Sequence, residues 1–242
     1  MTDLQQLSEI TRKWGGGFIT LVVGVAILAL ALPRVGAASG ALPAATAIFG
    51  LEQGQTFGSQ TLAGIEDDLQ TALSYEVETA ELNSQLSYLS LRRLLANKQN
   101  VPSRDEYQST LVHVENALKR RPLDAYLWTR YAHLSYLLGG LSPYTLAALD
   151  KSFQYGPQEK QLFQFRMTIC MLEWERLPAA LRESAHRQIA FGATHPRIWG
   201  YILADLPEKA GEKLLTFLAS AGADVTLAQR IAAGLQRNRS QN

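Results

Sequence analysis

The chain has 242 residues, of which 47% are apolar and 19% are charged, so it is long and apolar enough to fold around a core. Its 23 basic and 22 acidic residues give a net charge of +1 and are spread along the sequence, which excludes the basic surface typical of nucleic-acid-binding proteins. We therefore expect no nucleic acid among its partners.

The first predicted element is an apolar N-terminal helix. Residues 14–33, WGGGFITLVVGVAILALALP, carry no charge. A helix from Gly15 to Leu32 would be about 27 Å long at about 1.5 Å per residue, enough to cross a hydrocarbon core. Arg12 and Lys13 precede it, which favours a cytoplasmic N-terminus and places everything beyond about residue 35 outside the cytoplasm.

Two alternatives to a transmembrane helix stay open for this segment. The small residues of VGAASGA would suit a signal peptide cleaved after Ala37 or Ala38, and a buried helix of a soluble protein is the third interpretation. We favour the uncleaved anchor, because the preceding stretch TDLQQLSEITRK is long and acid-containing for a signal peptide. Both the anchor and the signal peptide export the rest of the chain.

The predicted domain organisation follows from this anchor. Residues 1–13 form a cytoplasmic segment, 14–33 the transmembrane helix or signal peptide, and 34–58 a linker or neck, because that stretch is rich in Ala and Gly with few charges. Residues 59–242 have helical periodicity and form a helical domain.

Within this domain the residues that separate the apolar segments are those of helix caps and not of turns between strands. Ser103 with Glu106 makes a capping box, and Asp124, Ser142 before Pro143, and Asp224 are further helix starts. The pattern predicts an all-α protein with helices near 60–74, 77–97, 103–120, 124–138, 143–155, 158–174, 178–191, 195–204, 208–220 and 224–237. Short loops between them predict antiparallel neighbours.

A repeat lies between Pro122 and Pro157, which are 35 residues apart. Its landmarks are Trp128, Tyr131, Ala132 and a turn at Gly139 and Gly140, followed by a second helix ending at Pro157. The spacing resembles that of tetratricopeptide helix hairpins, in which such residues pack neighbouring helices together. The resemblance implies a solenoid of three to four hairpins, in which Pro122, Trp128, Tyr131, Ala132, Gly139 and Pro157 are packing residues.

A second resemblance involves the stretch from Arg121 to Ile189, with its landmarks RPLDAYLWTRYA, QYGPQE and FRMTICMLEWERLPAALRES. It resembles the single-span, helix-rich VpsP-type accessory proteins of bacterial exopolysaccharide and O-antigen assembly. The resemblance implies a periplasmic helical module that serves a polysaccharide assembly or export machine.

The residues with reactive side chains favour no catalytic or metal site. Cys170 lies in the apolar run RMTICMLEW, which predicts a buried structural thiol. His113, His133, His186 and His195 have no metal-ligand spacing, and the acidic run Glu66, Asp67 and Asp68 points around a helix as a solvated face would. We therefore expect a non-enzymatic protein without a cofactor or a metal.

Arginines and a tryptophan are the better candidates for contact with a partner. Arg130, Arg166 and Trp174 offer stacking area and bidentate hydrogen bonds, which recur at interaction hot spots. The competing interpretation of Arg130 and Arg166 is a structural pair or a solvated face, and that of Trp174 is a packing residue of the core.

These observations lead to three functional hypotheses. The first is a single-pass protein of the bacterial inner membrane whose periplasmic domain is a scaffold for exopolysaccharide, capsule or O-antigen assembly. Its partners would be the membrane, proteins of an envelope assembly machine and, as a further candidate, a glycan. The second is an anchored helical-repeat chaperone or assembly factor of the secretion or cytochrome-maturation machinery. The third is an all-α envelope enzyme.

Overall fold

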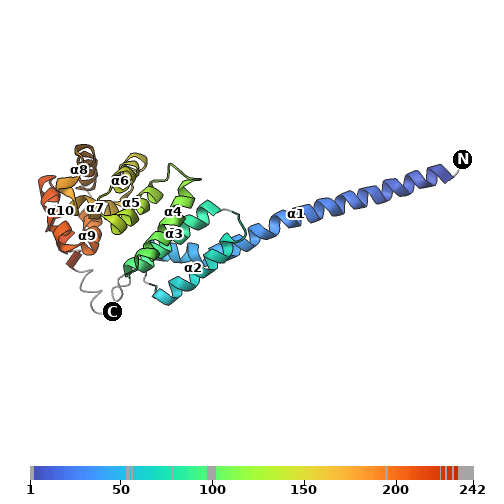
Figure 1. The fold of residues 1–242 in the computed structure, drawn as a ribbon, viewed down its shortest axis with the longest axis horizontal. Coiled ribbons are helices and arrows are strands. Elements are labelled where there is room, and N and C mark those ends of the chain that lie inside the picture. Colours follow the sequence, from blue (N-terminus) through green and yellow to red (C-terminus); the bar gives the residue numbers. More distant parts are fainter. Residues whose placement is uncertain are drawn as a thin grey trace. The chain divides into compact units, whose positions relative to one another are not determined.

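The fold is all-α in a computed structural model of the chain (Figure 1). The structure describes residues 3–52, 55, 57–77, 79–96, 102–193, 196–223, 225–226, 228–230 and 232–233, with most of their side chains from residue 20 onward. No strand occurs in these ranges, as the sequence predicts. The chain divides into two units, residues 1–93 and 94–242.

The first unit is built around one long helix. Helix α1 (Asp3–Glu52) packs through its C-terminal part against α2 (Ser59–Leu73), and most of α3 (Thr79–Ala96) belongs to the same unit. Small residues on α1 meet leucines on α2 and α3, because small side chains let the helices approach closely. The buried core consists of Ala37, Ala44, Ala47, Leu62, Leu69, Ala72, Leu82, Leu86 and Leu89.

The prediction of a weakly structured neck at 34–58 is wrong for residues 34–52. This stretch continues α1 without interruption, although Pro33 and Pro43 lie inside the helix. The Ala and Gly residues that suggested a tether are instead the face that packs against α2. Ala37, Ala44 and Ala47 are at most 2% exposed.

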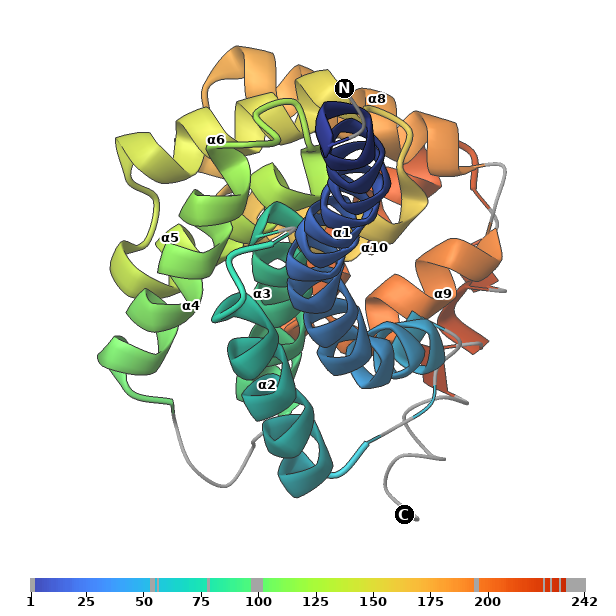
Figure 2. The ribbon, with the colours of Figure 1, turned by 90° about the vertical axis from the view of Figure 1, so that its right-hand side faces the viewer.

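The second unit is a series of consecutively packed helices resembling hairpin repeats. It comprises α4 (Arg104–Leu118), α5 (Ala125–Gly139), α6 (Pro143–Tyr155), η1 (Lys160–Leu162), α7 (Phe163–Leu172), η2 (Trp174–Arg176), α8 (Ala179–Ala193), α9 (Pro196–Asp205) and α10 (Glu208–Ser220). Neighbours in sequence pack together from α4 to α6 (Figure 2) and from α7 to α9, and α10 returns to α7 and α8 (Figure 1). Among the largest fully buried side chains of this unit are Phe163, Met167 and Trp199.

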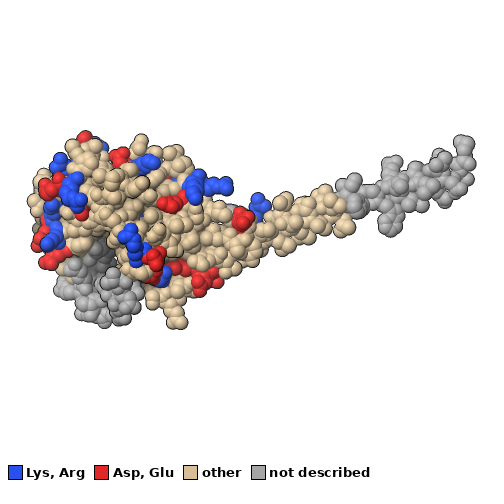
Figure 3. Space-filling model, in the orientation of Figure 1, with Lys and Arg blue, Asp and Glu red and all other residues tan. Residues whose placement is uncertain are grey.

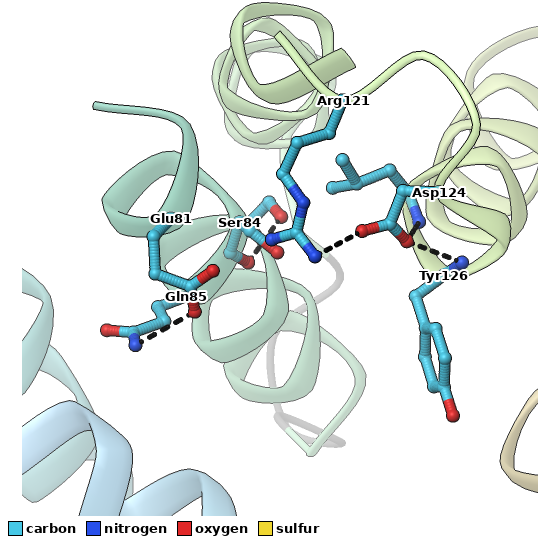
Figure 4. Close-up of polar contacts among 8 residues, drawn as sticks. Glu81, Ser84, Gln85, Arg121, Asp124 and Tyr126 are labelled. Carbon is cyan, nitrogen blue, oxygen red and sulfur yellow. Dashed lines mark hydrogen bonds and ion pairs between the residues drawn. The ribbon is translucent and has the colours of Figure 1, made fainter. Parts of the chain in front are cut away.

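Three of the predicted helix caps are confirmed. Ser103 and Glu106 form the reciprocal capping box, and the Ser142 hydroxyl accepts a hydrogen bond from the Thr145 amide with Pro143 in the first turn. Asp124 accepts from the amides of Tyr126 and Leu127 at 2.9 and 3.2 Å, and its other oxygen pairs with Arg121 at 2.8 Å (Figure 4). Asp224 lies outside the described residues.

The hairpin of α5 and α6 has the predicted turn. Helix α5 ends at Gly139, and Gly140 takes a φ of 68°, a left-handed conformation that glycine adopts without strain. Ala132 is fully buried between the helices. Pro122 and Pro157 lie exposed in the connections at the two ends of the repeat.

Candidate functional site

The N-terminal helix is the first candidate functional feature. Among the described residues, α1 is the one helix that is long and apolar enough to cross a membrane, over Thr20–Leu51. Its apolar side chains are exposed; Leu21, Leu30 and Leu32 are each 65% accessible. Figure 3 shows this part of the helix almost without charged side chains. Such a helix suits a membrane anchor or a signal sequence.

The C-terminal part of α1 is fitted closely to the end of α2. A Cβ atom at Gly36 would lie 2.6 Å from the Tyr75 ring, and one at Gly40 would lie 3.0 Å from both the Cβ of Ala72 and the backbone oxygen of Asp68. Glycine at Gly40 therefore lets the two helices approach closely, whereas a Cβ atom at Gly36 would displace the exposed Tyr75 ring.

The acidic run on α2 is only partly a solvated face. Asp67 and Asp68 are exposed, as predicted, but Glu66 is 7% exposed and pairs with Nε of Arg93 at 2.9 Å. The expectation is wrong for Glu66, because its position on the helix faces the core alongside Leu62 and Leu69. The acidic run thus combines a structural ion pair with two solvated carboxylates.

Arg166 is placed in the core of the second unit, so its prediction as a partner-binding residue is wrong. Its side chain is fully buried, and its Nε donates to the Ser152 hydroxyl at 2.7 Å. Its two terminal nitrogens donate to the backbone oxygens of Gly156, at 2.8 Å, and of Ser152. The guanidinium also lies 4.9 Å from the centre of the Phe153 ring.

These contacts give Arg166 a structural role. The Thr129 hydroxyl shares a hydrogen bond with the Ser152 hydroxyl, so α5, α6 and α7 are joined by one buried polar network. Burial lowers the pKa of Arg166 to about 10, and the guanidinium nevertheless stays charged at neutral pH. Arg166 therefore adds a second donor to the carbonyls of Ser152 and Gly156, which also accept from the backbone amides of Gly156 and Glu159, and it ties α7 to the C-terminal end of α6.

Trp174 is also mainly a packing residue. It is 8% exposed, and its ring packs at 4.8 Å against His186 and at 4.4 Å against Phe217, measured between ring centres. One edge borders a shallow hollow with Lys209, Glu212 and Lys213 on α10. Contact between a partner and Trp174 would be limited to that edge.

The remaining candidate, Arg130, lies half-buried on α5. Trp128 and Tyr131 on the same helix are also half-buried and pack against the core with ring centres 6.0 Å apart. Lys151 of α6 lies 4.0 Å above the Trp128 ring, and the Trp128 indole donates to the Pro122 carbonyl at 2.7 Å. Trp128 and Tyr131 are thus packing residues with one accessible side.

Tyr144, at the start of α6, extends this aromatic group into solvent, with 71% of its surface exposed. Burial, then the charge of Glu115 and then the electrostatic interaction with Tyr144 raise the pKa of Tyr131. The sequence analysis missed Tyr144 because a lone tyrosine after a helix-starting proline has no distinguishing pattern. We call the group formed by Trp128, Tyr131 and Tyr144 the aromatic surface.

The three histidines within the described ranges form no cluster. His133 is 5% exposed, with its ring edge against Phe165 at 5.0 Å and its Nδ1 without a hydrogen-bond partner. Burial lowers the pKa of His133 to about 4 and also lowers that of His113. His186 packs beside Trp174, and His195 lies outside the described residues. The described part of the chain holds no group of three or more metal-ligating side chains.

Cys170 is the buried thiol that the sequence predicts. It is fully inaccessible on α7, and burial raises its pKa to about 12 despite the nearby Arg166 charge. The thiol is therefore protonated at neutral pH and shielded from reagents.

No protein-family model, curated protein or solved structure matches the chain. Function is therefore inferred from the residues of the chain itself.

Proposed function

We propose that this chain is a membrane-anchored, non-catalytic helical scaffold of the bacterial inner membrane, with its two helical units on the periplasmic side. The observation that carries the proposal is the continuity of α1, which runs from the apolar segment directly into the packed hairpin with α2. A first unit joined to its anchor in this way is held at a fixed height above the membrane.

The packing of α1 supports an anchor that stays attached. Cleavage after Ala37 would remove Gly36, against which the Tyr75 ring packs, and would cut within the core of the first unit, where Ala37 is 2% exposed. Tyr75 also suits the membrane surface, because it lies beside Gly36 just beyond Arg34, and tyrosine is enriched at such interfaces.

The client that we propose is a machine that assembles or exports exopolysaccharide, capsule or O-antigen. Support comes from the landmark sequences between Arg121 and Ile189, which resemble those of the VpsP-type accessory proteins. The aromatic surface supplies a contact region of suitable chemistry, since exposed aromatic rings bind sugar and protein surfaces alike.

The first test is deletion of the gene, followed by measurement of the amount and chain-length distribution of the surface polysaccharide. We expect a shift in length or a loss of polymer, restored by the wild-type chain and not by a Tyr144→Ser, Arg130→Ser variant. An unchanged polysaccharide in the deletion strain would contradict the proposed client.

The aromatic surface also favours a second candidate, an anchored chaperone or assembly factor that binds unfolded peptides. A photo-crosslinking residue in place of Tyr144 separates the two, with the same residue at the exposed Lys119 as a control. Capture of glycan-assembly enzymes supports the scaffold. Capture of many unrelated secretory chains supports the chaperone and contradicts the scaffold.

A further inference from the structure

One face of α1 carries a large apolar side chain at every seventh residue. These residues are Leu21, Leu28, Val35, Leu42 and Phe49, and they are 65, 58, 64, 67 and 65% exposed. We call these five residues the outer stripe. Exposure of this degree along a whole helix face indicates that something outside the first unit covers it.

The outer stripe points away from α2. Successive residues of an α-helix are about 100° apart, so Leu42 and Gly40 differ by about 160° around the helix. Gly40 packs against Ala72, which places Leu42 on the far side. Beyond residue 35, the other large apolar residues of α1, Ile48 and Leu51, pack against the core of the first unit.

The spacing of the outer stripe is that of a helix-to-helix seam. A small residue follows each of the first four members at the third position, namely Gly24, Ala31, Ala38 and Ala45. Apolar residues that alternate in this way over a seven-residue repeat form the contact line of a left-handed coiled coil. Between Thr20 and Leu32 the other faces of α1 also carry exposed large apolar residues, as contact with lipid requires, whereas beyond residue 34 the exposed large apolar residues of α1 all belong to the outer stripe.

Lipid does not account for the part of the stripe nearest α2. A Cβ atom at Gly40 would lie 3.0 Å from the backbone oxygen of Asp68, so Asp67 and Asp68, whose carboxylates are exposed, are close to this level of α1. Carboxylates are costly in hydrocarbon, which places this level in water. Leu42 and Phe49 are still further from the apolar segment and therefore also lie in water.

We propose that the outer stripe joins two copies of this chain as a parallel coiled coil along α1, from Leu21 to Phe49. Two copies anchored in one membrane have the same orientation and present identical stripes at the same height. With Val35 and Ala38 as the a and d positions, Arg34 is a g position at the edge of the seam, and it faces the e position, Ser39, of the second copy, so the two like charges do not face each other. The inference rests on the proposed membrane anchor.

Disulfide crosslinking in membrane vesicles tests the seam on the full chain. A Leu42→Cys variant is compared with Gln70→Cys, an equally solvent-accessible position on α2, and with the wild-type chain, whose Cys170 is buried. Under mild oxidation we expect at least a tenfold larger yield of a species of twice the mass for Leu42→Cys than for Gln70→Cys. Equal yields, or a crosslink to a protein of another mass, would overturn the proposal.

A second measurement uses two differently tagged copies in mild detergent. Wild-type copies should co-purify, and a Leu42→Glu, Phe49→Glu variant should reduce co-purification at least tenfold while keeping its helical circular dichroism. Retained co-purification would also overturn the proposal. Extraction of the membranes at alkaline pH tests the anchor separately: a chain released by it contradicts the proposed function, whereas an anchored chain without crosslinks contradicts only the dimer.

Discussion

Arg166 satisfies three acceptors with one guanidinium, and the charge of nearby Glu159 also favours the charged form of this buried cation. Replacement by Met would keep much of the volume but remove the three hydrogen bonds of the guanidinium, so that the carbonyls of Ser152 and Gly156 keep only their backbone donors. Because a hydrogen bond to a charged group contributes about 1.5–3 kcal/mol and removal of the buried cation offsets part of the loss, we expect Arg166→Met to lower the free energy of unfolding by about 2–4 kcal/mol. Thermal or urea unfolding of the full chain in detergent measures the change.

The matched control for Arg166→Met is Arg187→Met. Arg187 pairs with Glu183 at 2.6 Å, but both side chains are well exposed, so this pair contributes little. We expect a change below about 0.5 kcal/mol for the control. A similar loss in both variants would show that Arg166 has no special structural role.

The lowered pKa of His133 predicts how the free energy of unfolding depends on pH. Its pKa is about 4 in the folded chain and near the ordinary value of 6.5 in the unfolded chain. Between these values the unfolded chain binds more protons, so stability falls as the pH is lowered from about 6.5 to about 4. His133→Phe keeps a ring beside Phe165 and removes this titration, so its stability should depend less on pH across that window.

Unfolding midpoints measured between pH 4 and 7 test the His133 prediction. A residual slope of the same sign is expected from His113, whose pKa is also lowered by burial. Phe165→Leu is the control, because it disturbs the same ring contact but keeps the histidine and hence the wild-type slope. Identical slopes for His133→Phe and the wild type would contradict the prediction.

At the scale of elements, helix boundaries were predictable wherever a cap is encoded by adjacent residues. Ser103 with Glu106 and Ser142 with Pro143 make local contacts that depend little on the rest of the fold. The C-terminal part of α1 was not predictable in this way, because Ala and Gly are as typical of a loose linker as of a close helix contact. Only the presence of α2, which packs against this part of α1, distinguishes a close helix contact from a loose linker.

Gly40 offers a test of this close contact. A leucine at Gly40 would collide with Ala72 and the Asp68 backbone, whereas Gly64 on α2 is exposed, with open space around its position. We expect Gly40→Leu to separate α1 from α2 and to lower the free energy of unfolding by about 1–3 kcal/mol. Gly64→Leu should be neutral or slightly stabilising, since leucine favours helix formation over glycine.

Hydrogen exchange of the α2 amides in the full chain measures the effect of Gly40→Leu directly. Exchange should become faster along α2 in Gly40→Leu and stay unchanged or become slower in Gly64→Leu. Equal protection in the two variants would mean that α1 does not depend on glycine at this contact.

For the whole molecule, an apolar N-terminal helix and a series of helix hairpins followed from hydrophobic periodicity and proline spacing. The location of the candidate partner-binding residues could not be predicted from these patterns, because arginine and tryptophan occur in buried packing positions as well as in exposed contacts. Arg166 is fully buried and Trp174 nearly so, while the exposed Tyr144 is marked by no motif. Which side of a hairpin faces solvent depends on the neighbouring hairpins, which a single repeat does not specify.

The continuity of α1 has a mechanical consequence. A flexible tether would absorb any turning or sliding of the apolar segment, but a single helix transmits both to the hairpin with α2. Inserting one residue beside Arg34 would rotate the apolar segment by about 100° and displace it by about 1.5 Å relative to that hairpin. The number of residues between the apolar segment and the hairpin therefore sets the rotational phase of one relative to the other.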